Sequence, residues 1–331
     1  MTAPVPHWPG RRVTLAGGER VWLAETPAAK KELVLCVHGM SGAATNWTDF
    51  MAELVPDFDC VALDLPGSGF SPPPKTNAGY SVSALAGTVI RLIEFLGSAT
   101  DDETTDDGPA NGGRGVHLVG NSMGGAVSVR VAARRPDLVK TLTLVSPAMP
   151  DLKVSRGVLH FPVLALPFVG ERLVRQWATR YPVENRVAGV YATCLYDPSC
   201  VHPDRFALEV EELRRRDAQP HGAASLVGAS RTLVSETLRP YPLSLWRAAK
   251  RVTAPSLVLF GRHDRLVKPR LAARATSAFS DARVTVLPET GHIGQMEHPG
   301  LIAALFREMV EETRTRAAEA GNSGRRDPVD A

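Results

Sequence analysis

Residues 116–134 read VHLVGNSMGGAVSVRVAAR, which is a short apolar run, a glycine-rich turn and a segment with helical periodicity. The run at Val116–Val119 predicts a buried strand, and the spacing of apolar residues over Met123–Arg134 predicts a helix. Between them stands Gly120-Asn121-Ser122-Met123-Gly124, a G-x-S-x-G motif in the strand–turn–helix context that it requires. A serine on so tight a turn has a strained backbone and presents its hydroxyl above the sheet. Ser122 is therefore the first candidate for a nucleophile.

The same order of strand and helix repeats along most of the chain. Arg11–Leu15 and Val21–Ala24 flank a Gly17-Gly18 turn and predict an antiparallel hairpin. Repeated strand–helix units predict an α/β fold with a mostly parallel sheet and helices on both faces. The other expected strands are Leu33–Val37, Cys60–Leu65, Thr141–Val145, Ser256–Phe260 and Val284–Leu287, and the other expected helices include Trp47–Val55, Val82–Leu96, Arg270–Phe279 and Leu301–Arg314.

Three segments depart from this order. Residues 98–115 contain five acids and no large apolar residue, which predicts a flexible, solvated insertion. Residues 148–246 lack strand alternation and predict a helical cap inserted between two strands. Residues 317–331 are expected to form a disordered tail. The expected core therefore consists of residues 1–147 and 247–316.

Composition excludes several classes of protein. The chain has 331 residues, of which 44% are hydrophobic and 22% are charged, as in a soluble globular protein rather than a disordered, fibrous or multi-span membrane protein. A net charge of +3 does not favour nucleic-acid binding. The N-terminus does not resemble a secretory signal, so a cytoplasmic location is expected. The apolar stretch Val158–Gly170 is too short to span a bilayer, although contact with a lipid interface remains an open alternative. The four cysteines are expected to be free thiols, with a Cys194–Cys200 disulfide as the exception.

A serine hydroxyl needs a base that a third group orients. Asp264 and His292 each stand in a loop directly after an expected strand, so they should lie at the same edge of the sheet as Ser122. Asp151, which closely follows the strand Thr141–Val145, is a rival for the role of the acid.

Two backbone N–H groups are candidates for an oxyanion hole. Met40 follows the strand Leu33–Val37 at the start of a loop of small residues, and Met123 directly follows the candidate nucleophile. Asp64 is followed by Pro66-Gly67 and is expected to fix a turn rather than to act as the catalytic acid.

Five sequences in this order resemble the α/β-hydrolase superfamily: HGMSG (38–42), DLPGSGFS (64–71), GNSMGG (120–125), GRHDRLV (261–267) and GHIGQMEHP (291–299). The resemblance implies an eight-stranded sheet with an inserted cap, a Ser122–His292–Asp264 catalytic triad, and acyl transfer to water without a metal or organic cofactor. Serine at position 122 argues against the haloalkane dehalogenases and epoxide hydrolases of this fold, which use aspartate there.

The expected substrate is a small carboxylic ester with an apolar acyl or alkyl part, as for an esterase or lipase. Aromatic residues in the cap suggest an apolar pocket, although most of them can serve only to pack the cap onto the core. The candidate substrate contacts are Trp47, Phe161, Phe168 and Trp177.

Two other functions remain open. GNSMGG and GHIGQMEHP, with Gln295 and Glu297, also resemble the carbon–carbon bond hydrolases that cleave ring-fission products of aromatic degradation. Those enzymes usually have tryptophan where this chain has Ile293, and their cap arginine has no evident counterpart in the sequence. A non-catalytic binding module of the same fold is the second alternative, and the presence of all three triad candidates argues against it.

Overall fold

The computed structural model describes residues 5–29, 31–98, 115–153, 160–166 and 168–323. These residues form an eight-stranded sheet with the strand order β1-β2-β4-β3-β5-β6-β7-β8. β1 and β2 form a hairpin, β2 runs antiparallel to β4, and the remaining neighbours are parallel. The expected eight-stranded, mostly parallel sheet is therefore confirmed. The strands are β1 (Gly10–Thr14), β2 (Arg20–Glu25), β3 (Leu33–Val37), β4 (Asp59–Asp64), β5 (Val116–Asn121), β6 (Val139–Val145), β7 (Ser256–Gly261) and β8 (Ala282–Leu287).

The central strand β3 shows why helices cover both faces of the sheet. Its LVLCV run is buried at every position. Because successive side chains point to opposite faces, Leu33, Leu35 and Val37 join one hydrophobic cluster and Val34 and Cys36 join another. The first cluster contains residues of α2 (Val82–Ser98), α3 (Met123–Arg134), α9 (Leu245–Ala249) and α10 (Leu271–Ala278), and the second contains residues of α1 (Thr48–Leu54) and α12 (Pro299–Ser323).

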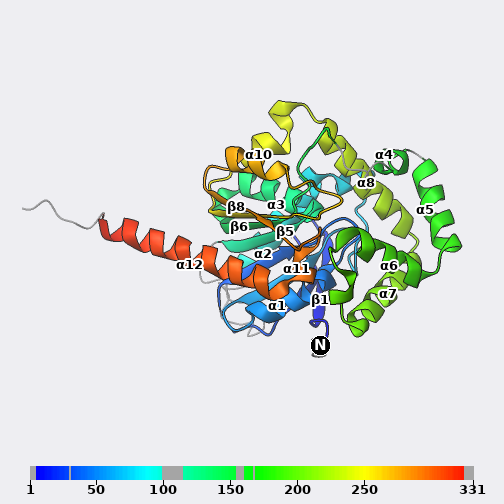
Figure 1. The fold of residues 1–331 in the computed structure, drawn as a ribbon, viewed down its shortest axis with the longest axis horizontal. Coiled ribbons are helices and arrows are strands. Elements are labelled where there is room, and N and C mark those ends of the chain that lie inside the picture. Colours follow the sequence, from blue (N-terminus) through cyan, green and yellow to red (C-terminus); the bar gives the residue numbers. More distant parts are fainter. Residues whose placement is uncertain (1–4, 30, 99–114, 154–159, 167, 324–331) are drawn as a thin grey trace, which may run out of the picture.

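Helices fill the described part of the chain between β6 and β7, and Figure 1 shows α4 to α8 gathered on one side of the sheet. Thr232 Oγ1 donates to Tyr80 O at 2.6 Å, and Arg130 of α3 pairs with Glu236 of α8 at 3.1 Å, so α8 is fastened to the core. That residues 148–246 form a separate cap remains a prediction. The expected end of this cap falls within α9, which packs on α3. The helices are α4 (Phe161–Leu164), α5 (Val169–Arg180), α6 (Val183–Cys194), α7 (Pro203–Asp217) and α8 (Gly222–Leu238).

The C-terminal helix is longer than the sequence suggested. α12 continues to Ser323, so residues 317–323, which were expected to be disordered, are helical. The alanines and the glutamate that follow Arg316 are good helix formers, which explains why α12 continues beyond that residue. The rest of that expected tail, residues 324–331, lies outside the described residues. The same holds for residues 99–114 of the acidic insertion. In the segment considered for lipid contact, residues 158–159 and 167 also lie outside the described residues. Within the described ranges, no helix has the length and hydrophobicity to cross a membrane.

Gly124 shows how closely α3 approaches the sheet. A Cβ at this position would clash with the carbonyl oxygens of Val37 and His38, which are backbone atoms and cannot turn away. We therefore expect Gly124→Ala to lower the free energy of unfolding by about 1–3 kcal/mol, measured by urea denaturation. Gly189→Ala in α6 is the matched control, because a Cβ there meets nothing within 4 Å. An equal stability change in both variants would contradict the expected close contact.

Candidate active site

Ser122 occupies the turn between β5 and α3 in a conformation that residues with side chains rarely adopt. Its φ is 52° and its ψ is −117°. The surrounding backbone holds it there: Ser122 N donates to Val145 O at 3.0 Å, and Ser122 O accepts from Ala148 N at 2.9 Å. Local strain of this kind persists only when neighbouring structure fixes it, and it is concentrated at functional sites. The backbone geometry therefore fits the strained turn expected at the end of β5, and Ser122 itself is buried, at the wall of two cavities.

Asp264 and His292 are joined by a hydrogen bond at the same edge of the sheet. His292 Nδ1 lies 2.8 Å from Asp264 Oδ2, and both side chains are buried. Asp264 Oδ1 accepts from Leu266 N at 2.8 Å and from Val267 N at 2.9 Å, which fixes the carboxylate plane. Because a carboxylate accepts, we assign the proton to Nδ1, which leaves Nε2 able to accept another.

Ser122 and His292 line the same two cavities. No hydrogen bond links Ser122 Oγ to the His292 ring in the part of the chain that the structure describes, and such contacts are often loose in unliganded enzymes. The two loops are nevertheless tied together, because Asn121 Nδ2 donates to His292 O at 3.0 Å and to Val145 O at 3.0 Å. Asn121 thus fixes the spacing between the nucleophile turn and the histidine loop.

Glu297 anchors the other side of the histidine loop. It lies at the end of the short helix α11 (Gly294–Glu297), and its Oε2 accepts from Gly291 N at 2.7 Å. Its Oε1 accepts from Tyr196 N at 2.7 Å and from Asp197 N at 3.0 Å, both in the segment after α6. From the sequence, Glu297 was evident only as part of a family pattern, and this anchoring role was not predicted. Its position five residues after His292 was the available signal.

The Met40 loop is shaped to leave an N–H group unused. His38 Nε2 accepts from Leu65 N at 3.0 Å while its Nδ1 faces Gly39 O at 2.7 Å, and burial lowers the pKa of His38 to about 4, so the ring is neutral. None of the hydrogen bonds found among the described residues uses Met40 N. Met123 N, at the first position of α3, has no partner within the helix. Both N–H groups therefore remain available as oxyanion donors.

Asp64 fixes the Met40 loop through hydrogen bonds to two backbone N–H groups. Its Oδ1 accepts from Ala44 N and its Oδ2 from Phe70 N, each at 2.7 Å. This is the turn-fixing role that the sequence suggested.

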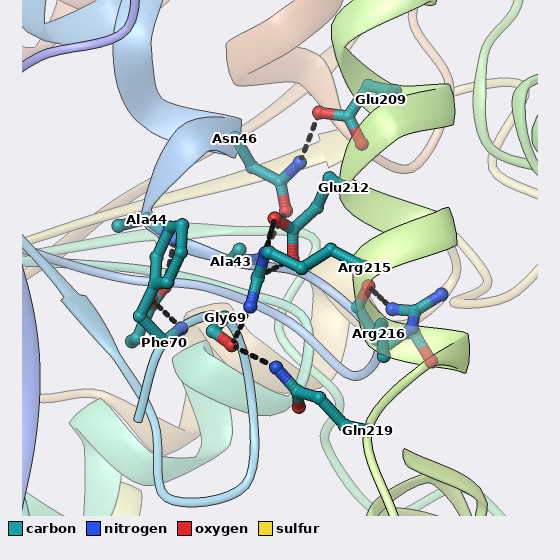
Figure 2. A network of polar contacts seen from close by, with 12 residues as sticks. Ala43, Ala44, Asn46, Gly69, Phe70, Glu209, Glu212, Arg215, Arg216 and Gln219 are labelled. Atoms are coloured by element: carbon teal, nitrogen blue, oxygen red, sulfur yellow. Dashed lines mark hydrogen bonds and ion pairs between the residues drawn. The ribbon is translucent and has the colours of Figure 1, made fainter. Parts of the chain in front are cut away.

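Helix α7 also contacts the Met40 loop (Figure 2). Arg216 Nη1 donates to Ser41 O at 2.6 Å, next to Met40, and Asn46 Nδ2 donates to Glu209 at 3.2 Å. The neighbouring Arg215 pairs with Glu212 and donates to Gly69 O at 2.7 Å. The loop that would carry the oxyanion donor is thus held partly by the cap.

Two cavities meet at the candidate catalytic residues, since Met40, Ser122 and His292 line both. The larger has a volume of about 380 Å³ and mostly apolar walls, and the smaller has a volume of about 120 Å³ and contains charged side chains. The larger is further lined by Ala148, Met149, Asp151, Leu152, Phe161, Pro162, Leu233, Val234, Thr237, Leu238, Leu266, Val267, Lys268 and Leu271.

Of the four expected substrate contacts, the structure places only Phe161 at these cavities. Trp47 is fully buried in the core, with its ring centroid 5.5 Å from that of Phe50. Phe168 is 92% exposed, and Trp177 lies on the outer part of α5 beneath Arg186, 5.2 Å away. The prediction is corrected for these three residues. An aromatic residue in a sequence carries the same signal whether it packs the core, covers the surface or lines a pocket.

Asp151, the rival for the role of the acid, and His263, which precedes Asp264 in the sequence, contact other groups. Asp151 pairs with Arg270 at 2.5 Å and accepts from Lys153 N, so Asp264 is the carboxylate that contacts His292. His263 lies against the Tyr196 ring, with centroids 4.4 Å apart. Over the described ranges, no group of three or more His, Cys, Asp or Glu side chains is placed to hold a metal ion.

Known proteins share the fold of this chain. The family model for the alpha/beta hydrolase fold matches residues 32–299. The chain belongs to this family. It is 28% identical over 311 residues to a 2-hydroxy-6-oxononadienedioate/2-hydroxy-6-oxononatrienedioate hydrolase of Cupriavidus pinatubonensis, covering 91% of this chain and 93% of that one.

Lipases are also among its relatives. The chain is 24% identical to Lipase 3 of a Moraxella species over 287 residues, covering 87% of this chain and 80% of that one. A putative lipase of Acinetobacter baumannii superposes with a TM-score of 0.72 at 19% identity, covering 93% of this chain and 92% of that one, which shows the shared fold alone. This family member is therefore a hydrolase whose relatives include two reaction types.

The contact between Asp264 and His292 predicts a large loss of activity in Asp264→Asn. The amide would favour the wrong imidazole tautomer, so we expect kcat to fall roughly 1,000- to 10,000-fold in an ester hydrolysis assay. Asp151→Asn is the matched control and should change kcat by less than about tenfold, since Asp151 does not contact His292. The assignment of the acid would be wrong if the two variants lost activity equally.

Glu209 predicts a pH-dependent change in stability. Burial, reinforced by the nearby Glu212 carboxylate, raises the pKa of Glu209 to about 7, above the value near 4.3 of an unfolded chain. The contribution of Glu209 to the free energy of unfolding is therefore largest below about pH 4 and is lost as the pH rises through 7. The melting temperature of Glu209→Gln minus that of wild type should therefore increase by about 3 °C between pH 5 and pH 8, measured by calorimetry.

The control for this experiment is Glu211→Gln, the same change at an exposed position of α7. Its difference in melting temperature from wild type should stay constant over this range. A constant difference for Glu209→Gln as well would contradict the raised pKa.

Proposed function

We propose that this protein is a serine hydrolase that cleaves a carboxylic ester with an apolar acyl part. Ser122 attacks the ester carbonyl, His292 takes the serine proton at Nε2 and delivers it to the leaving alcohol, and Asp264 holds the ring and stabilises its charged form. The N–H groups of Met40 and Met123 bind the oxyanion. Water, activated by His292, then releases the acid from Ser122.

The apolar larger cavity is the observation that carries the ester assignment. It opens at Ser122 and His292, and its side chains are mainly aliphatic or aromatic, with Asp151 and Lys268 as the charged exceptions. Asp151 is neutralised by its pair with Arg270. A site of this kind gains affinity by removing apolar surface from water. An acyl chain fits this mainly apolar environment, in which Lys268 is the cationic side chain of the lining.

Carbon–carbon bond cleavage is the second candidate, and the relative from Cupriavidus supports it. Arg216 of α7, which lines the smaller cavity, is a candidate for the cap arginine of those hydrolases. Two carboxylates, Glu209 and Glu212, line the same cavity, and Ile293 stands where those hydrolases usually have tryptophan. A substrate carboxylate in that cavity would face two carboxyl groups and an arginine that already donates to Ser41 O, which favours ester hydrolysis.

A fluorophosphonate probe and an ester panel test this function. Wild type should be labelled and Ser122→Ala should not, while Ser235→Ala, an exposed serine of α8, should label like wild type. On p-nitrophenyl esters of rising chain length, kcat/KM should increase from acetate towards medium chains, as the larger cavity fills. Equal labelling of wild type and Ser122→Ala would identify a different nucleophile. Turnover of a vinylogous 1,5-diketone with no turnover of any ester would favour the second candidate.

A further inference from the structure

The smaller cavity lies between the catalytic residues and the cap. Its core wall is formed by residues 39–43 of the Met40 loop, together with Ser122 and His292. Its cap wall comes from α6 and α7 and includes Tyr191, Glu209, Glu212 and Arg216. With about 120 Å³ against about 380 Å³ for the larger cavity, it has room for only a short group. An ester bound at Ser122 must place its two halves on different sides of the scissile bond, so the two cavities can take one half each.

Tyr191 lines this cavity, and its buried hydroxyl is unused. The residue is only 4% exposed, and its hydroxyl has no hydrogen-bond partner among the described residues. Its ring is fixed by contact with Phe206, with centroids 5.9 Å apart. A buried polar group without a partner is unfavourable, and it is rare unless a ligand or water completes it. The hydroxyl therefore marks a position where a ligand could donate or accept a hydrogen bond.

Glu209 adds a second polar group with spare capacity. Its Oε1 accepts one hydrogen bond, from Asn46, and its raised pKa lets the carboxyl group donate as well as accept near neutral pH. Of the charged groups, Glu212 is bound at both oxygens by Arg215, and Arg216 donates to Ser41 O. The cavity therefore offers hydrogen bonds to a neutral group rather than a free charge for an anion.

We infer that the smaller cavity binds the leaving alcohol of the ester, and that this alcohol is short, uncharged and carries additional hydroxyl groups. The inference rests on the proposed ester hydrolysis and adds the class of alcohol to it. The apolar acyl chain occupies the larger cavity, and the hydroxyl groups of the alcohol bind Tyr191 and Glu209. A carboxylate on the alcohol is disfavoured because the carboxyl groups of Glu209 and Glu212 line the cavity, while Arg215 is paired with Glu212 and Arg216 donates to Ser41 O.

Three octanoate esters that differ only in the alcohol test this inference: propyl, 2,3-dihydroxypropyl and 2-carboxyethyl. We expect kcat/KM for the dihydroxypropyl ester to exceed that for the propyl ester by about tenfold, as one or two hydrogen bonds to uncharged groups provide. The carboxyethyl ester should be the poorest substrate. The inference is overturned if propyl octanoate is hydrolysed as well as the dihydroxypropyl ester, or if the carboxyethyl ester is the best of the three.

Tyr191→Phe tests the residue that carries the argument. The preference for the dihydroxypropyl over the propyl ester should fall about fivefold, since one hydrogen bond is lost. Tyr181→Phe, the same change on the exposed end of α5, should leave the preference at its wild-type value. Because the Tyr191 hydroxyl has no partner, its removal should leave the melting temperature equal to or above that of wild type. An unchanged preference in a folded Tyr191→Phe would overturn the inference.

The outcomes separate this inference from the proposed function. Hydrolysis of all three esters without the expected preference overturns the inference and leaves ester hydrolysis intact. No turnover of any ester, together with no labelling of Ser122 by the fluorophosphonate, overturns both.

Discussion

The geometry of the site depends on the backbone of Ser122, which is held in an unfavourable conformation between β5 and α3. That conformation is stable because the chain around it has no freedom to relax: Val145 O and Ala148 N bind the Ser122 backbone, and Gly124 lets α3 pack directly against β3. The same turn places Met123 N at the start of α3, beside the serine. A single local constraint thus positions both a nucleophile and one of two candidate oxyanion donors.

The remaining parts of the site come from loops, and each loop is fastened to a neighbour. Asn121 ties the histidine loop to the serine turn, and Glu297 ties it to the segment after α6. The Met40 loop is held by Asp64 from the core and by Arg216 and Glu209 from the cap. In nearly all of these contacts, one of the two partners is a backbone atom. The positions of the loops therefore depend little on the identity of the side chains at their tips.

The sequence was informative where a residue type is required by geometry or chemistry. The G-x-S-x-G motif and the apolar runs predicted the sheet and the position of Ser122, because only glycine fits at Gly124 and only apolar residues fill a strand covered on both faces. Asp264 and His292 were found because parallel strands end at one edge. Sequence could not distinguish Trp47, buried in the core, from a pocket aromatic, nor show that Tyr191, Glu209 and Arg216 meet in one cavity. Those outcomes depend on how the cap helices dock, which local patterns do not encode.

The relatives of this chain include a 2-hydroxy-6-oxononadienedioate hydrolase and a lipase, so membership of the family does not specify the reaction. Under the proposed ester hydrolysis, the leaving group must fit between Ser122 and α7. The residues of α7 at that position are acidic as well as basic, and the guanidinium of Arg216 is directed to the Ser41 carbonyl. An arginine that holds the Met40 loop is less available to bind a substrate carboxylate. We therefore propose that the charges of α7 favour a neutral leaving group and that this helix, rather than the candidate catalytic residues, decides between the two candidate reactions.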